Sequence, residues 1–148
     1  MLRTDLAIID RRGKPIAMVE VKNRRGTSRT WATGLWRNLL AHGQRFAPLP
    51  FFLIVTRDRL YLWKHSAERP APSPPDLELD LGPVLRPYFE KLGLESETIS
   101  GMAFELLVGA WLSDLTRLEE PADGPQALAE SGFLASIQNG RLDDSVAA

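Results

Sequence analysis

Two short apolar runs near the start of the chain predict its first two strands. Residues 6–9 form one run and residues 15–21 the other. Between them, residues 10–14 are polar and include a glycine that suits the positive φ of a tight turn, so the two runs should pair as an antiparallel hairpin. Glu20 and Lys22 then share one face of the second strand, because side chains alternate with a period of two.

The pattern then changes to helical spacing and back. Apolar residues recur three and four positions apart over residues 29–42, which predicts an amphipathic helix ending near Gly43. Residues 51–56 are too apolar for a half-exposed strand and predict a central one. After a turn at residues 57–59, residues 60–63 predict the next strand. The order of elements is strand, strand, helix, strand, strand.

Prolines separate the two halves of the chain. Residues 66–75 hold four prolines and cannot be helical, which predicts a stiff, extended connector. Beyond it, leucines alternate with acids over residues 77–81, a pattern that suggests a short edge strand. Pro83 can then begin a helix that runs toward Gly93.

Further helices are expected in the second half. Residues 97–117 carry apolar side chains at helical spacing, and residues 125–137 predict a weaker helix followed by a frayed terminus. The chain should therefore be an α/β protein with a mixed central sheet flanked by helices. Within it we expect a core over residues 1–65, the connector over 66–75, and an acidic, mainly helical extension over 76–148 packed on the same domain.

Composition excludes several classes of site and location. With 44% apolar and 25% charged residues, the 148-residue chain has the proportions of a globular protein of one domain. It has no cysteine, so a metal site must use oxygen or imidazole ligands. The first residues do not form a signal peptide, and no apolar run approaches the roughly 18 residues of a membrane span, so a cytoplasmic location without a membrane partner is expected.

The net charge of -1 conceals two halves of opposite sign. Residues 1–70 hold 14 Lys and Arg against 5 Asp and Glu, whereas residues 71–148 hold 4 against 14. A basic surface attracts phosphate backbones, so the first half is expected to face nucleic acid. The alternative is that the basic half docks onto the acidic half, within one chain or between two copies.

A pair of carboxylates is expected to meet at one end of the hairpin. Antiparallel pairing brings the start of the first strand beside the end of the second, so Asp5 and Glu20 should converge. Two carboxylates are costly to place together without a cation, and hard oxygen ligands favour Mg²⁺ or Mn²⁺. The Lys22 ammonium would point into the same pocket, where it can orient a water molecule or stabilise negative charge on a phosphate.

This arrangement resembles the PD-(D/E)xK phosphodiesterases, also called restriction-endonuclease-like nucleases. Thr4-Asp5 would stand for the Pro-Asp of that family and Glu20-Val21-Lys22 for its acid-x-Lys, and the order of hairpin, helix and two strands matches its core. The resemblance implies a metal-dependent nuclease. Asp5, Glu20 and the main-chain carbonyl of Val21 would hold the metal, and Lys22 would assist hydrolysis.

The chain also departs from that family. Its members commonly have a helix before the first strand, often with another acidic residue, whereas four residues precede Asp5 here. The helix is expected to be lost by truncation, supplied by another subunit, or absent from a degenerate core. The alternative for Asp5 and Glu20 is that they form surface ion pairs with basic neighbours, which contribute only about 0–1 kcal/mol and imply no function.

Four arginines beyond the proposed site are candidate phosphate contacts. Two lie in the polar loop after Lys22 and two lie on the helix that follows: Arg24, Arg25, Arg29 and Arg37. Guanidinium groups bind phosphate oxygens through paired donors and position a nucleic acid without reading its sequence. The alternative is that these side chains are merely exposed at the start of a helix.

Three functions are compatible with this sequence. The first is a Mg²⁺-dependent nuclease, with DNA as the favoured substrate. The second is a catalytically degenerate module of the same fold that binds DNA or a protein partner. The third is a non-enzymatic assembly subunit, a homo-oligomer whose basic and acidic halves pair between chains. The acidic helical extension favours some protein contact in each case.

Overall fold

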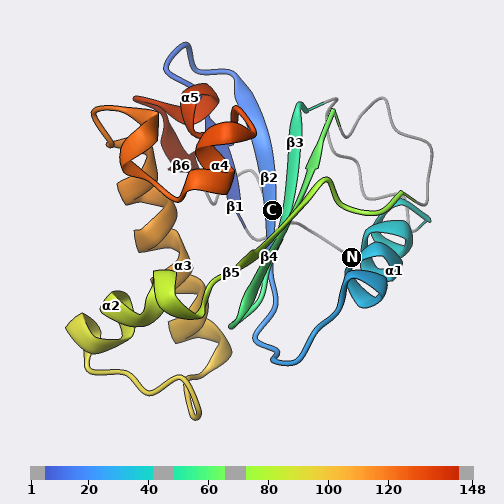
Figure 1. The fold of residues 1–148 in the computed structure, drawn as a ribbon, viewed down its shortest axis with the longest axis vertical. Helices are drawn as coiled ribbons and strands as arrows, with labels where there is room; N and C mark the ends of the chain where they lie inside the picture. Colours follow the sequence, from blue (N-terminus) through green and yellow to red (C-terminus); the bar gives the residue numbers. More distant parts are fainter. Residues whose placement is uncertain (1–5, 42–48, 66–72, 144–148) are drawn as a thin grey trace.

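In the computed structural model the chain forms one mixed six-stranded sheet with helices on both faces (Figure 1). The structure describes residues 6–41, 49–65 and 73–143. The first half contributes, in order, β1 (Leu6–Ile9), β2 (Pro15–Val21), α1 (Arg29–Ala41), β3 (Phe51–Val55) and β4 (Arg59–Lys64). The second half contributes β5 (Leu77–Asp80), α2 (Gly82–Leu92), α3 (Gly101–Thr116), the 3₁₀ turn η2 (Pro121–Asp123), α4 (Gln126–Glu130), α5 (Phe133–Ile137) and β6 (Arg141–Asp143).

The sheet has the order β5-β4-β3-β2-β1-β6. β1 and β2 form the expected antiparallel hairpin, in which Leu6 lies opposite Val19. The carboxylate of Asp10 closes the hairpin turn, because it accepts hydrogen bonds from the backbone N–H groups of Arg12 and Lys14, both at 2.9 Å. The strands β2 and β3 pair in parallel, and α1 is the crossover that a parallel connection requires. All other neighbouring strands are antiparallel.

Two apolar layers cover the two faces of the sheet. Of the described helices, α1 lies on one face, and α2 to α5 lie on the other (Figure 1). We call the first the α1 layer; in it Trp36 stacks on Trp63 with ring centroids 5.5 Å apart. In the second, the α2–α5 layer, Phe51 packs edge-on against Phe133 at 5.3 Å. The expected α/β architecture with a mixed sheet flanked by helices is thus confirmed.

Both halves of the chain contribute to the sheet. β5 is the edge strand expected from the alternating leucines, and α2 begins beside Pro83 and ends at Gly93, whose φ of 67° suits a glycine. Proline-rich residues 66–72 and Gly43 lie outside the described residues. None of the described helices is long and apolar enough to span a membrane.

Three expectations for the second half are corrected by the structure. α3 begins at Gly101 rather than near residue 97, because Ser100 caps it and its hydroxyl accepts a hydrogen bond from the Ala103 N–H at 3.1 Å. The helix expected over residues 125–137 is two short helices separated at Gly132, where φ is 88°. Where a frayed terminus was expected, β6 pairs with β1 at the edge of the sheet.

Gly140 provides a test of how β6 is docked. A Cβ at this position would lie 2.3 Å from the Ile9 carbonyl oxygen and 2.9 Å from that of Ile137, and neither backbone atom can move freely. Gly140→Ala should therefore destabilise the fold by about 1–3 kcal/mol, as overpacking does. Gly34→Ala in α1, where a Cβ meets nothing within 4 Å, should instead stabilise it by about 0.5–1 kcal/mol. Urea unfolding measures both, and equal effects would contradict the close packing at Gly140.

Candidate active site at the carboxyl end of β2

Glu20 is a buried carboxylate near the carboxyl end of β2. Its side chain lies on the face of the α1 layer, because Met18, two residues earlier on the strand, belongs to that layer. β1 and β3 flank the strand, and Glu20 lies beside Ile54 in the parallel register. Only 3% of the residue is exposed. A charged group so placed needs a compensating partner, since burial disfavours the ionised form.

Lys22 supplies that partner. Its Nζ lies 3.1 Å from Oε1 of Glu20, and 37% of the lysine side chain is exposed. The backbone N–H of Lys22 donates to the Val55 carbonyl at 2.9 Å, so extended pairing continues past the end of β2 and keeps Lys22 on the same face as Glu20. The structure therefore brings together two of the three residues predicted to be catalytic, and the ammonium remains accessible from solvent.

Asp5, the third predicted catalytic residue, lies outside the described residues. The residue after it, Leu6, pairs with Val19, the residue before Glu20. Val21 turns its side chain into the α2–α5 layer, so only its main chain is available to the site. Across residues 6–41, 49–65 and 73–143 no three His, Asp or Glu side chains gather as a metal site. In that part of the chain Glu20 is the one predicted carboxylate ligand, and a metal site of the expected kind depends on Asp5 for its second.

The loops that follow β2 and β3 are tied together at the same edge of the sheet. The backbone N–H of Gly26, at φ 64°, donates to the Asp58 carboxylate at 3.1 Å, and that of Arg57 donates to the Arg24 carbonyl at 3.0 Å. The Thr56 hydroxyl donates to Asp58 at 3.2 Å. Hydrogen bonds therefore hold together the two loops at the carboxyl end of the parallel β2–β3 pair. α/β proteins commonly bind ligands at this position.

A hydroxyl cluster two strands away from Glu20, formed by Thr27, Thr56 and Tyr61, was not anticipated from the sequence. Tyr61 is fully buried and lies in the same row of the sheet as Glu20 and Ile54, on the α1 face. Its hydroxyl shares a hydrogen bond of 2.9 Å with Thr27, and burial raises the pKa of the Tyr61 phenol, so it is neutral at pH 7. The available signal was Thr56, a polar residue directly after an apolar strand. The position of Thr56 relative to Glu20 depends on the parallel pairing of β2 and β3, which periodicity does not reveal.

The four arginines predicted to contact phosphate have different surroundings. Arg24 lies over the ring of Trp31, 5.5 Å from its centroid. Arg25 pairs with Glu97 at 2.6 Å, and Arg29 lies 3.8 Å from Glu78. The fourth, Arg37, is exposed on α1 and makes no ion pair with a described residue. Two of the four are thus engaged with the acidic half of the same chain, as in the docking alternative, and phosphate contact stays a prediction for all four.

The Arg25–Glu97 ion pair leads to a prediction about the pKa of Glu97. The hydrogen bond and charge of Arg25 lower the pKa of Glu97 below its ordinary value. The pair therefore stabilises the fold above the pKa of an unfolded-state glutamate, and this contribution is lost as the pH falls through the lowered pKa of Glu97. Arg25→Gln should raise the Glu97 pKa toward the ordinary value, whereas Arg24→Gln should leave it unchanged. Carboxyl ¹³C shifts against pH measure it, and an unmoved pKa in Arg25→Gln would refute the pair.

Comparison with known proteins does not assign a function to this site. No family model, no curated protein and no solved structure matches the chain. The function must therefore be inferred from the arrangement of the chain's own residues.

Proposed function

We propose that this chain is a metal-dependent phosphodiesterase of the PD-(D/E)xK type that acts on nucleic acid, with DNA as the expected substrate. One observation carries the proposal: a carboxylate buried to 3% exposure lies 3.1 Å from a lysine ammonium at the end of a central strand. An isolated surface ion pair would not need to bury its acid inside the sheet. Charge pairs in which one partner is buried and the other is accessible to solvent are typical of functional sites.

The arrangement of strands supports the same proposal. An antiparallel hairpin, a helical crossover, a parallel third strand and an antiparallel fourth follow in the order expected for a nuclease core. The proposal requires the β1–β2 register to extend by one residue beyond Leu6 and Val19. Asp5 would then stand beside Glu20 and supply the second carboxylate.

Glu20 and Asp5 would offer the hard oxygen donors that Mg²⁺ and Mn²⁺ prefer, together with the main-chain carbonyl of Val21. A bound divalent metal would polarise a phosphoryl oxygen and lower the pKa of a water molecule. Glu20 is already neutralised by Lys22 in the described structure. The ammonium must therefore move from the carboxylate toward the substrate when the site is loaded, and its 37% exposure leaves room for that movement.

Lys22 then has a distinct role in hydrolysis. In hydrolysis, water adds across one P–O ester bond: its oxygen forms a bond to phosphorus, that ester bond breaks, and one proton of the water ends on the leaving alkoxide oxygen. The Lys22 ammonium orients that water and stabilises the negative charge that develops on the phosphate. Glu20 would bind the metal and Lys22 would face the reacting phosphate. Replacing the two residues should therefore have different effects on metal binding and on cleavage.

A second candidate is the catalytically degenerate module of the same fold. The observation that favours it is the Lys22–Glu20 ion pair itself, because a carboxylate satisfied by an ammonium gains less from a metal than an unpaired one. Nucleic-acid or protein binding without cleavage would then be the function. Metal binding by the purified chain separates this candidate from the first.

Replacement of Glu20 and of Lys22 should have different effects on metal binding. Glu20→Gln, like Asp5→Asn, should abolish Mn²⁺ binding and DNA cleavage together, because each removes a metal ligand. Lys22→Ala should keep or tighten Mn²⁺ binding, since it removes a competing cation, while the cleavage rate falls by about 10²–10³ as for loss of one electrostatic stabiliser. Calorimetry and single-turnover cleavage measure the two effects.

The matched controls for this test are Glu90→Gln and Lys91→Ala, exposed changes of the same charge on α2. Both should behave like the wild type. A second readout does not need activity: Mn²⁺ should raise the melting temperature of Lys22→Ala at least as much as that of the wild type, and should not raise that of Glu20→Gln. Wild-type protein that binds no Mn²⁺ would refute the metal-dependent mechanism and favour the degenerate module.

Nucleic-acid binding should depend on the salt concentration and on whether Arg25 is paired with Glu97. If Arg25 must leave Glu97 to reach a phosphate, Glu97→Gln should tighten DNA binding several-fold, and Arg25→Gln should weaken it and reduce the salt slope by about 0.9. Arg37→Gln, which breaks no ion pair with a described residue, should weaken binding similarly.

Glu95→Gln is the control for the Arg25 test, because it removes the same charge from the same loop without touching Arg25. Fluorescence anisotropy with a labelled duplex at several salt concentrations gives all four affinities. If Glu95→Gln and Glu97→Gln tighten binding equally, Arg25 has no special contact. Binding that is indifferent to salt would exclude the basic half as a phosphate-binding surface.

A further inference from the structure

The outer face of α3 carries a stripe of apolar side chains where polar ones are usual. Met102 is 78% exposed, Leu106 is 71% exposed, and Ala110, one turn further on, is also exposed. The opposite side of the helix is buried in the α2–α5 layer. A helix on the surface of a protein normally presents charged or polar residues to water, so the stripe indicates a face that another surface covers.

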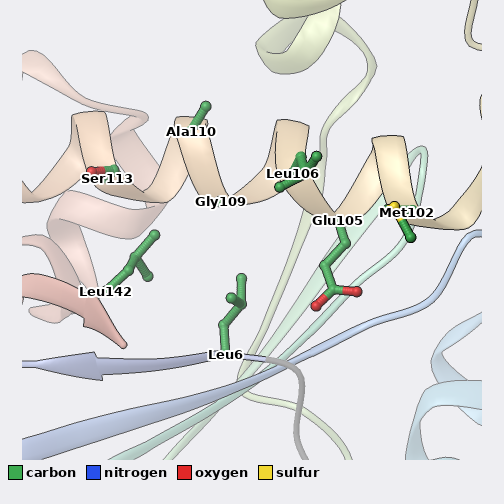
Figure 2. Close-up of a pocket in the computed structure, with 8 residues that line it drawn as sticks. All are labelled: Leu6, Met102, Glu105, Leu106, Gly109, Ala110, Ser113 and Leu142. Carbon is green, nitrogen blue, oxygen red and sulfur yellow. The ribbon is translucent and has the colours of Figure 1, made fainter. Parts of the chain in front are cut away.

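A groove runs alongside this stripe, between α3 and the strands β1 and β6. Figure 2 shows Leu6 from β1 and Leu142 from β6 pointing toward α3 from below. The groove has a volume of about 530 Å³, and α3 lines it with six residues: Met102, Glu105, Leu106, Gly109, Ala110 and Ser113. The surface therefore has both protruding side chains and a hollow to receive them.

Four of these positions, Met102, Leu106, Gly109 and Ser113, are complementary to one another in an antiparallel pair of helices. When two copies of α3 lie antiparallel about a two-fold axis between Leu107 and Val108, each position faces the one equally far on the other side of the axis. Met102 then faces Ser113, and Leu106 faces Gly109. Every pair joins a long side chain to a short one, so the protruding residues of one copy enter the hollow of the other. Small residues opposite large ones let helices approach closely.

We propose that this face binds a second copy of the chain, in a two-fold symmetric dimer with α3 packed antiparallel on α3. A two-fold interface requires the same patch on both subunits, and these residue pairs meet that requirement. A parallel arrangement would set Leu106 against Leu106 and leave Gly109 facing Gly109, which opens a gap.

The dimer is independent of the proposed active site. Glu20 and Lys22 lie on the α1 face of the sheet, and α3 lies in the opposite layer (Figure 1). The stripe extends about 17 Å along the helix axis. This is short for a standard interface, which takes about 800 Å² from each partner, so we expect a weak dimer with a Kd of about 10–100 µM.

Sedimentation of the full chain over a range of concentrations tests the proposal. The wild type should change from monomer to dimer across about 10–100 µM. Leu106→Glu should shift the midpoint upward at least about 30-fold, because it buries a charge in the interface. The matched control is Leu92→Glu on α2, where leucine is also exposed, at 51%. It should leave the midpoint unchanged. A wild type that stays monomeric at all concentrations overturns the proposal and points to another occupant of the groove.

Cysteine cross-linking tests the register, and the chain has no native cysteine to interfere. Met102→Cys and Ser113→Cys chains, mixed and oxidised, should form a disulfide-linked heterodimer. Neither variant alone should cross-link, because in this register like positions lie about 17 Å apart along the axis, beyond the roughly 7 Å that a disulfide spans. A homodimeric Met102→Cys disulfide would show parallel packing and overturn the antiparallel arrangement, and the absence of any cross-link in the mixture would overturn it too.

Discussion

The burial of β3 on both of its faces is the constraint on which the rest of this structure depends. Its five residues are all buried, and the strands beside it are nearly so. A sheet with a doubly buried centre needs a helical layer on each side. α1 provides one layer and at the same time makes the crossover that lets β2 and β3 run parallel. The second half of the chain provides the other layer, which is why the two halves form one sheet rather than two units.

The same constraint gives the Glu20–Lys22 pair its character. A carboxylate on a central strand lies among apolar neighbours, where an ionised group is stabilised only by a partner close at hand. Lys22 reaches it because extended pairing with Val55 continues beyond the end of β2. At the end of β2, the Lys22 ammonium therefore compensates the buried charge of Glu20 and is also accessible to solvent. This combination of a buried acid and an accessible ammonium supports the proposed phosphodiesterase.

Basic residues of the first half pair with acidic residues of the second half in the folded chain. Arg25 pairs with Glu97, and Arg29 and Arg59 both lie near Glu78, so three ion pairs between described residues join the basic half to the acidic half. These pairs are largely exposed and contribute modestly to stability, since water screens them. Their larger effect is on binding, because a guanidinium engaged with a carboxylate must be released before it can contact a phosphate.

Local pattern was sufficient to predict the hairpin, α1, the central strand and the shared face of Glu20 and Lys22. These features depend on side-chain alternation and turn chemistry, which neighbouring residues encode. The capping of α3 by Ser100 was equally local, but the helical periodicity that precedes it concealed the boundary. The sequence could therefore predict most elements and the direction of the Glu20 and Lys22 side chains.

Only the tertiary structure decided which distant segments meet. The parallel register of β2 and β3, the pairing of β6 with β1, and the contact of Arg25 with a glutamate 72 residues away all depend on how the layers close around the sheet. The outward direction of Met102 and Leu106 was decided in the same way, because a helix that is apolar on most of its circumference does not reveal which side will be buried. Periodicity reports on the neighbours of a residue along the chain, whereas these contacts depend on the competition between whole surfaces for burial.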